Sequence, residues 1–255
     1  MEYIGSALNF YYEGMFLKDI ALHLKETYDY SPSNSLILYW IEKYMNLAVN
    51  YFKYFNPQVG SEWLVWVDDA ALLGIKSKRK IYIYDVMDKN TRFLLSSQIA
   101  SVRTISKVEN VCRDAATYAK IMPRSIITDI RYPFLNGEKI VVGNKIFLIP
   151  DMPYPSDDDV ELMERFKVIV KNKNIEVKRS FRNINSLANF LKGWLVHYNY
   201  FKPNPSIGNI TPAEKSLINC KINNWTELVK LLEKRSGRSL YLPVRKPAAV
   251  ILPVK

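Results

Sequence analysis

Two adjacent aspartates in an otherwise apolar β segment are the feature that most constrains how this chain folds. Residues 63–69 (WLVWVDD) are rich in β-branched and aromatic side chains, and they end in Asp68 and Asp69. A carboxylate in a core strand loses much of its solvation energy unless a partner or a cation lies beside it. The segment therefore predicts a core strand that carries a metal site.

Two further β segments follow this strand. Residues 80–88 and 91–100 have the same β-branched and aromatic character, and Gly74 and the run DKN at 88–90 separate the three segments. Three consecutive strands with short connections predict an antiparallel meander.

A helix and a fourth strand are expected after the meander. Residues 101–122 repeat apolar side chains at helical intervals, and residues 124–130 (RSIITDI) are predicted to form a short buried strand that ends in Asp129. A strand that follows a crossover helix lies parallel to an earlier strand of the sheet. If that earlier strand is the first one, Asp68 and Asp129 lie side by side.

The N-terminal part has helical periodicity in three pieces, at residues 5–13, 17–28 and 34–51. The turn sequence DYSPS precedes the third piece, and its Ser33 can cap that helix. This arrangement predicts a helix-turn-helix, although a plain three-helix bundle fits the same pattern. In the helix-turn-helix, the side chains available to the major groove are Asn34, Ser35, Tyr39 and Lys43.

The C-terminal half is expected to be mostly helical. A further strand is predicted at 139–149, and the acidic run at 157–159 favours a helix that extends to about residue 171 and contains Glu161 and Glu164. Residues 185–201 form the clearest amphipathic helix, and shorter helices are expected at 213–217 and 224–234. His197 and His23 are interpreted as structural or hydrogen-bonding side chains.

The composition indicates a soluble protein with a polyanionic partner. The 255 residues contain 36 Lys and Arg and 25 Asp and Glu, and the net charge of +11 favours nucleic acid, although a proteome rich in lysine would give the same charge. The two cysteines have no metal-ligand spacing, and no apolar run reaches the roughly 20 residues that span a bilayer. We therefore expect a cytoplasmic protein without a membrane segment.

Several passages resemble the DDE transposases of the retroviral-integrase superfamily, in the insertion-sequence group with an N-terminal helix-turn-helix. WVDDA is similar to the first acidic strand of that family, and IITDI is similar to the second. The most specific passage is HYNYFKPNPSIGNITPAEK, which is similar to the family's closing segment HYN..RPH..LG..TPAE. The resemblance covers roughly residues 5–220.

The resemblance implies a catalytic and metal-binding triad of Asp68, Asp129 and Glu164, with 60 residues between the first two and 34 between the last two. Three such carboxylates hold two Mg²⁺ or Mn²⁺ ions for phosphoryl transfer. Asp69 remains an alternative to Asp68, because the two point to opposite faces of a strand. Glu161 remains an alternative to Glu164, because it lies three residues earlier on the same helix.

The expected fold class is α/β. A ribonuclease-H-like core, with a mixed five-stranded sheet and flanking helices, spans residues 56–220. A small all-α helix-turn-helix domain precedes it at residues 1–55, and a C-terminal helix and tail follow at residues 221–255. Basic side chains after the third acid, among them Lys167, Lys171 and Arg179, are expected to grip DNA phosphates.

The expected function is DNA transposition, with metal-dependent strand cleavage and strand transfer at insertion-sequence ends. The implied partners are the double-stranded DNA of the transposon inverted repeats and the target, in a homodimer or larger assembly near the nucleoid. The alternative is a catalytically inactive, domesticated DNA-binding protein, because Ile130 replaces the usual glycine of the family and Asp69 the usual glutamate. A nuclease for RNA–DNA hybrids is a third class.

Overall fold

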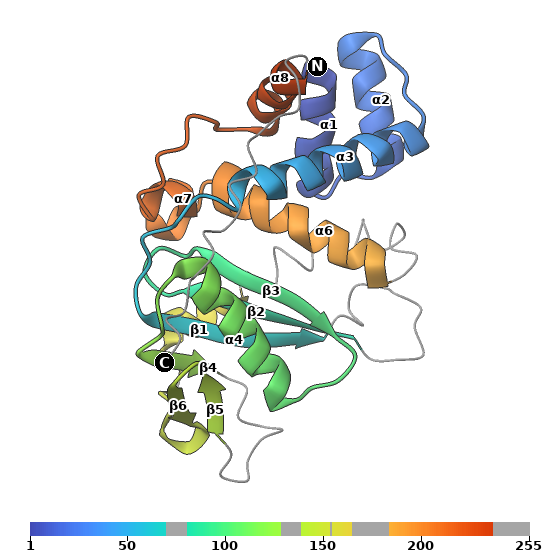
Figure 1. The fold of residues 1–255 in the computed structure, drawn as a ribbon. Helices are drawn as coiled ribbons and strands as arrows, with labels where there is room; N and C mark the ends of the chain where they lie inside the picture. The colour runs from blue at the N-terminus through green and yellow to red at the C-terminus, as the bar shows by residue number, and fades with distance from the viewer. Residues whose placement is uncertain (70–80, 129–138, 154, 165–183, 237–255) are drawn as a thin grey trace, which may run out of the picture.

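A computed structural model describes residues 1–69, 81–128, 139–153, 155–164 and 184–236 of the chain (Figure 1). It is an α/β protein with a mixed four-stranded sheet at its centre. The helices α1, α2, α3, α6 and α8 lie on one side of the sheet in Figure 1, and a small hairpin lies on the other.

The meander predicted from the sequence is confirmed. Strands β1 (Glu62–Asp69), β2 (Tyr82–Asp88) and β3 (Leu94–Ala100) pair antiparallel in order. The connection between β2 and β3 is held by a buried carboxylate: Asp88 accepts hydrogen bonds from the backbone N–H and the hydroxyl of Thr91 at 2.8 and 2.7 Å. Asp88 also accepts from the Gly60 N–H at 2.8 Å, which ties the start of β1 to this turn.

The predicted parallel strand is also confirmed. Helix α4 (Ile105–Ala119) crosses the sheet, and β4 (Ser125–Thr128) then pairs parallel with β1, so the strand order is β3-β2-β1-β4. The apolar stripe of α4, which includes Val108, Val111 and Cys112, is buried. The chain returns beside β1 because β4 and the crossover helix α4 both bury their apolar residues against the same sheet.

Residues 139–149 differ from the prediction. They were expected to add one strand, but they form two, β5 (Lys139–Val142) and β6 (Lys145–Leu148), which pair as a separate two-stranded sheet. The reason is Gly143, whose φ of +60° suits the first position of a two-residue hairpin turn. Among the described residues the main sheet therefore has four strands rather than five.

The N-terminal helices α1 (Glu2–Tyr12), α2 (Leu17–Tyr28) and α3 (Asn34–Phe52) agree closely with the sequence pattern. Ser33 caps α3, as expected, because its Oγ accepts from the Leu36 N–H at 3.2 Å. The left-handed Asp29 ends α2 and turns the chain toward α3.

The C-terminal helices pack between and beside these elements. Helix α6 (Ile184–Val196) continues as a π-helical turn at His197–Phe201, and α7 (Pro212–Lys215) and α8 (Trp225–Ser236) follow. Helix α1 approaches α8 closely at Gly5, where an added Cβ would lie 2.4 Å from the Thr226 Cα. One hydrophobic core runs through the helices and the sheet, and the domain boundaries at residues 55 and 220 stay predictions.

Residues 157–164 are helical, as the acidic run predicted, and the rest of the predicted helix, to about residue 171, lies outside the described residues. The Ser156 hydroxyl accepts from the Asp159 N–H at 3.2 Å, and the Asp159 carboxylate accepts from the Ser156 N–H and hydroxyl. This reciprocal pair is a capping box, which satisfies the first N–H groups of the helix. No helix in the described part of the chain is long and apolar enough to cross a membrane.

Candidate active site

The first predicted acid lies on the strand that the sheet places at its centre. The backbone of Asp68 on β1 pairs with that of Ile83 on β2, and the backbone of Asp69 pairs with that of Tyr82. On the other side of β1, Val65 pairs with Thr128 of β4. Asp129 follows Thr128 in the sequence and lies outside the described residues. The strand that leads to Asp129 is therefore the direct neighbour of the strand that carries Asp68.

The third predicted acid belongs to the helix at residues 157–164. Both Glu161 and Glu164 are exposed there, so the structure leaves the choice between them open. The start of this helix is attached to the β2–β3 turn by an ion pair of 3.1 Å between Lys89 Nζ and Asp159 Oδ2. Burial alone would raise the pKa of Asp159, but the hydrogen bonds from Ser156 and the ion pair with Lys89 lower it. This carboxylate is thus a structural anchor.

A metal site formed by the triad stays a prediction. Within the described residues, no group of three histidine, cysteine or carboxylate side chains is placed to hold a metal ion. That search does not include Asp129 or the side chains of Asp68 and Asp69, which lie outside the described part of the structure. The chemistry of the predicted donors fits the implied metal, because carboxylate oxygens are the ligands that Mg²⁺ and Mn²⁺ prefer.

A further carboxylate on the sheet was missed by the sequence analysis. Asp85 lies in the middle of β2 and is 3 % exposed, between Trp66 of β1 and Ser97 of β3 in register. The signal that identified Asp68 was present here too, since Asp85 interrupts the apolar run of residues 81–87. The buried Asp88 three residues later accepts hydrogen bonds from the turn that follows it.

The residues predicted to contact DNA fall into two groups. Asn34, Ser35 and Tyr39 are exposed on α3, as such contacts require. Lys43 is instead half-buried, and its Nζ lies 2.9 Å from Glu233 Oε1 of α8. The Tyr44 hydroxyl donates to the same oxygen at 2.6 Å. This arrangement ties α3 to α8. The remaining predicted contacts lie outside the described residues: Lys167, Lys171 and Arg179.

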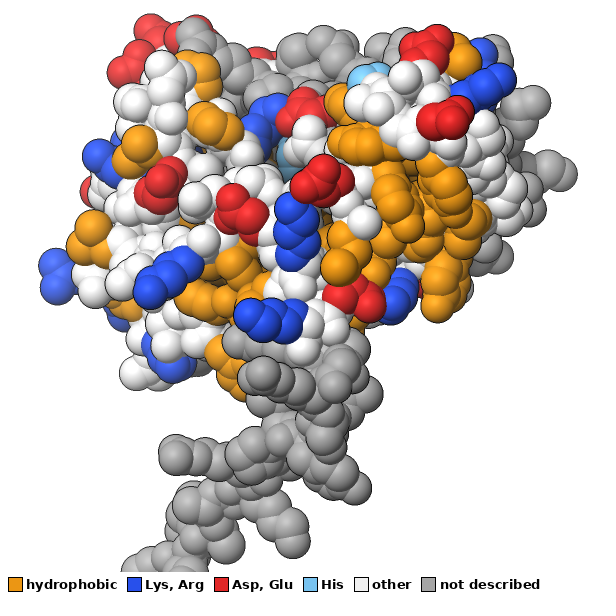
Figure 2. All heavy atoms as spheres, turned by 90° about the horizontal axis from the view of Figure 1, so that it is seen from above, with side chains coloured by type: hydrophobic (Ala, Val, Ile, Leu, Met, Phe, Trp, Pro, Cys, Tyr) orange, Lys and Arg blue, Asp and Glu red, His pale blue; other side chains and the backbone are white. Residues whose placement is uncertain are grey.

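The N-terminal helices do not share the basic character of the chain. Residues 1–55 contain four Lys and Arg and six Asp and Glu, so the net charge of +11 comes from the remainder. On the face seen in Figure 2, basic side chains are scattered among acidic ones, and hydrophobic side chains gather at one side. The basic side chains that could bind an anionic partner therefore lie mainly after residue 55.

Comparisons with known proteins do not assign the chain to a family. Neither models of known protein families nor curated proteins match the chain. The resemblance to the DDE transposases accordingly depends on the quoted residues.

The closing segment, which is the most specific part of the resemblance, has a structural role. The buried Asn199 side chain accepts from the Leu94 N–H and donates to the Leu94 carbonyl, both at 2.9 Å, and so holds the first residue of β3. Thr211 and Glu214 form a capping box at the start of α7. These residues connect the edge of the sheet to the C-terminal helices.

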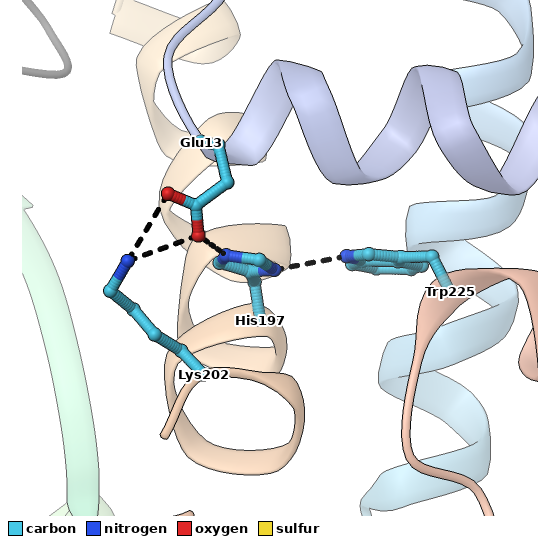
Figure 3. A network of polar contacts seen from close by, with 4 residues as sticks. All are labelled: Glu13, His197, Lys202 and Trp225. Carbon is cyan, nitrogen blue, oxygen red and sulfur yellow. Dashed lines mark hydrogen bonds and ion pairs between the residues drawn. The ribbon is translucent and has the colours of Figure 1, made fainter. Parts of the chain in front are cut away.

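His197 is the buried centre of a polar network (Figure 3). The indole N–H of Trp225 can only donate, so at 3.2 Å it requires His197 Nδ1 to accept. His197 Nε2 therefore carries a proton in the neutral ring and donates it to Glu13 Oε1 at 2.8 Å, and Lys202 Nζ lies 3.0 Å from the same oxygen. Figure 3 shows these side chains converging from different parts of the chain, and the interpretation of His197 as structural is confirmed.

Proposed function

We propose that this chain is a DNA transposase that cleaves the ends of an insertion sequence and joins them to target DNA. The observation that carries the proposal is the parallel pairing of β1 with β4 beside an antiparallel meander. This strand order agrees with a ribonuclease-H-like core, and it makes neighbours of the strand with Asp68 and the strand that precedes Asp129.

In this proposal the chain's own carboxylates form the catalytic site. Asp68, Asp129 and Glu164 would hold two Mg²⁺ or Mn²⁺ ions, which, when bound, favour ionisation of the attacking water or hydroxyl and stabilise the leaving oxygen. Because no covalent protein intermediate is needed, a Ser–His or Cys–His pair is not required. The three carboxylates must lie within coordinating distance of the same two ions.

The substrate in this proposal is double-stranded DNA. The exposed Asn34, Ser35 and Tyr39 on α3 would contact the inverted repeats, and the basic residues after position 55 would bind phosphates. Joining two ends requires at least two active sites, so we propose a homodimer or larger assembly that acts at the nucleoid.

The test is cleavage of a DNA duplex that carries the inverted repeats flanking the coding sequence, with Mn²⁺ or Mg²⁺. We expect Asp68→Asn, Asp129→Asn and Glu164→Gln each to reduce cleavage at least about 100-fold, because each removes a metal ligand. Asp157→Asn is the matched control, since Asp157 is an exposed acid at the start of the same helix. Equal cleavage by wild type and Asp129→Asn would contradict the proposal.

The same assay separates the alternatives. Loss of cleavage in Glu161→Gln, with Glu164→Gln active, would identify Glu161 as the third metal ligand. Specific binding of the repeats by the wild type with no cleavage would instead support the inactive, domesticated DNA-binding protein.

A further inference from the structure

An open hollow of about 420 Å³ lies between the end of α3 and the end of α4. Its volume is within the range of ligand-binding pockets, about 300–1,000 Å³. Figure 1 shows the end of α4 beside the connection from α3 to β1, so residues far apart in the sequence meet here. Six of the lining residues follow α3 directly or lie at the end of α4: Lys53, Tyr54 and Asn56, and Thr117, Tyr118 and Lys120.

Tyr54 presents an aromatic ring to solvent beside this hollow. It is 73 % exposed, the largest exposed fraction among the described large hydrophobic side chains. The Lys53 ammonium lies 4.9 Å from the ring centroid, and the second face of the ring can accept a planar ligand. Tyr118 is instead held in place, because its hydroxyl lies 3.1 Å from that of Tyr200 and its ring stacks on Phe93 with centroids 6.1 Å apart. The hollow therefore combines a fixed aromatic side chain with an exposed one.

Two lysines give the hollow a positive charge. Lys53 and Lys120 are both exposed, and neither forms an ion pair with a described carboxylate. The carboxylate among the lining residues is that of Asp114, which accepts a hydrogen bond from the Gln98 amide. Two ammonium groups against one carboxylate leave an excess of positive charge, which attracts an anionic ligand.

Polar groups lie between the two lysines along the lining. Within the described part of the chain, no group hydrogen-bonds to the side chain of Asn56. The Thr117 hydroxyl donates to the Arg113 carbonyl at 2.9 Å, so its oxygen can still accept a hydrogen bond. A ligand that fits this hollow has a flat face, a polar edge and a negative charge. A nucleotide has all three features.

We propose that the hollow binds an unpaired nucleotide of single-stranded DNA, with its base on the Tyr54 ring and its flanking phosphates at Lys53 and Lys120. A base inside a duplex is covered on both faces by its neighbours, so only an unstacked base can lie on the ring. Single-strand sites without sequence preference combine basic side chains with aromatic rings in this way. The inference goes beyond the proposed function, because it requires none of the three predicted catalytic acids.

The test is the fluorescence anisotropy of a labelled oligothymidylate of about 12 nucleotides, titrated with the full chain. We expect Tyr54→Ala to raise the Kd about 5-fold to 100-fold, because it removes a stacking partner of the base. Tyr54→Phe keeps the ring and should stay within about twofold of the wild type. An abasic strand of the same length has the phosphates without the bases, so Tyr54→Ala should leave its Kd unchanged. Because Tyr54 is exposed, Tm should also stay unchanged.

The double variant Lys53→Gln with Lys120→Gln tests the phosphate contacts. For a single strand, each phosphate contact adds roughly 0.7 to the slope of log K against log salt concentration, so the slope should become shallower by about 1.4. Lys18→Gln is the matched control, because Lys18 is also exposed beside an aromatic ring, 5.7 Å from that of Phe16, but does not line the hollow. It should leave the slope unchanged.

A wild-type Kd for the oligothymidylate in Tyr54→Ala would overturn the inference. An equal loss of affinity for the abasic strand would also overturn it, because the effect would then not depend on a base. Tighter binding of an oligouridylate than of the oligothymidylate would assign the hollow to RNA instead of DNA. These results are independent of metal-dependent duplex cleavage, so the inference and the proposed function can fail separately.

Discussion

Replacement of Asn199 by leucine tests how the closing segment holds the sheet. The amide of Asn199 makes two hydrogen bonds of 2.9 Å to the backbone of Leu94, and both residues are fully buried. Leucine is similar in size and forms neither bond. The N–H and the carbonyl of Leu94 would then lie without partners in the interior.

The expected loss follows from the cost of an unpaired buried polar group, about 1–3 kcal/mol each. Two such groups, partly offset by the more favourable burial of leucine, lower the free energy of unfolding by about 2–4 kcal/mol. This is a large part of the roughly 5–15 kcal/mol that stabilises a protein domain. The physical reason is that β3 begins at Leu94, so its first backbone groups depend on a side chain 105 residues later.

The measurement is urea unfolding followed by tryptophan fluorescence, where we expect a lower midpoint with an unchanged slope. Asn46→Leu is the control, because Asn46 is exposed on α3 and bonds only within its own helix. It should change the free energy of unfolding by less than about 0.5 kcal/mol. The reasoning is refuted if Asn199→Leu is as stable as this control.

The substitution Asn199→Asp separates the effect of the hydrogen bonds on stability from the effect of packing. Asn199→Asp keeps the shape and the acceptor for the Leu94 N–H, but a carboxylate cannot donate to the Leu94 carbonyl. We expect it to be destabilised at neutral pH and partly restored at low pH, where the protonated carboxyl can donate. A destabilisation that is the same at both pH values would contradict the assignment of the donor.

Three further changes test the packing, the backbone and the charges. Gly193→Ala should lower the free energy of unfolding by at least about 1–3 kcal/mol, since the new Cβ would lie 1.8 Å from the Tyr12 hydroxyl; urea unfolding measures this. Lys120→Gly should raise Tm, with a gain of about 1 kcal/mol, because Lys120 ends α4 with a φ of 56°. Hydrogen bonds from Lys43 and Tyr44 lower the pKa of Glu233. The charged Glu233 therefore adds less than about 1 kcal/mol to the free energy of unfolding at neutral pH, and this addition is lost as the pH falls through the lowered pKa. Glu233→Gln should remove this part of the pH dependence of the urea midpoint.

Each of these expectations has a contrary result. A Gly193→Ala protein of wild-type stability would mean that Tyr12 moves at little cost. An unchanged Tm in Lys120→Gly would show that the left-handed lysine carries no strain. A Glu233→Gln protein that keeps the wild-type pH dependence would assign that dependence to other carboxylates.

The local structure of this protein was predictable from its sequence. The β-branched and aromatic residues of segments 63–69 and 80–88 indicated β1 and β2, and the apolar spacing of residues 101–122 indicated α4. Ser33 indicated the start of α3. These signals are local because residue propensity, helical periodicity and capping each involve residues a few positions apart.

Only the tertiary structure decided which distant residues meet. It paired Lys43 with Glu233 across 190 positions, and it buried Asn199 against the backbone of Leu94, a contact that no local pattern marks. The hairpin at residues 139–149, by contrast, has a local cause, because Gly143 provides its turn. The physical reason is that local periodicity selects the type of element, whereas the partner of a buried polar group depends on how all the elements pack together.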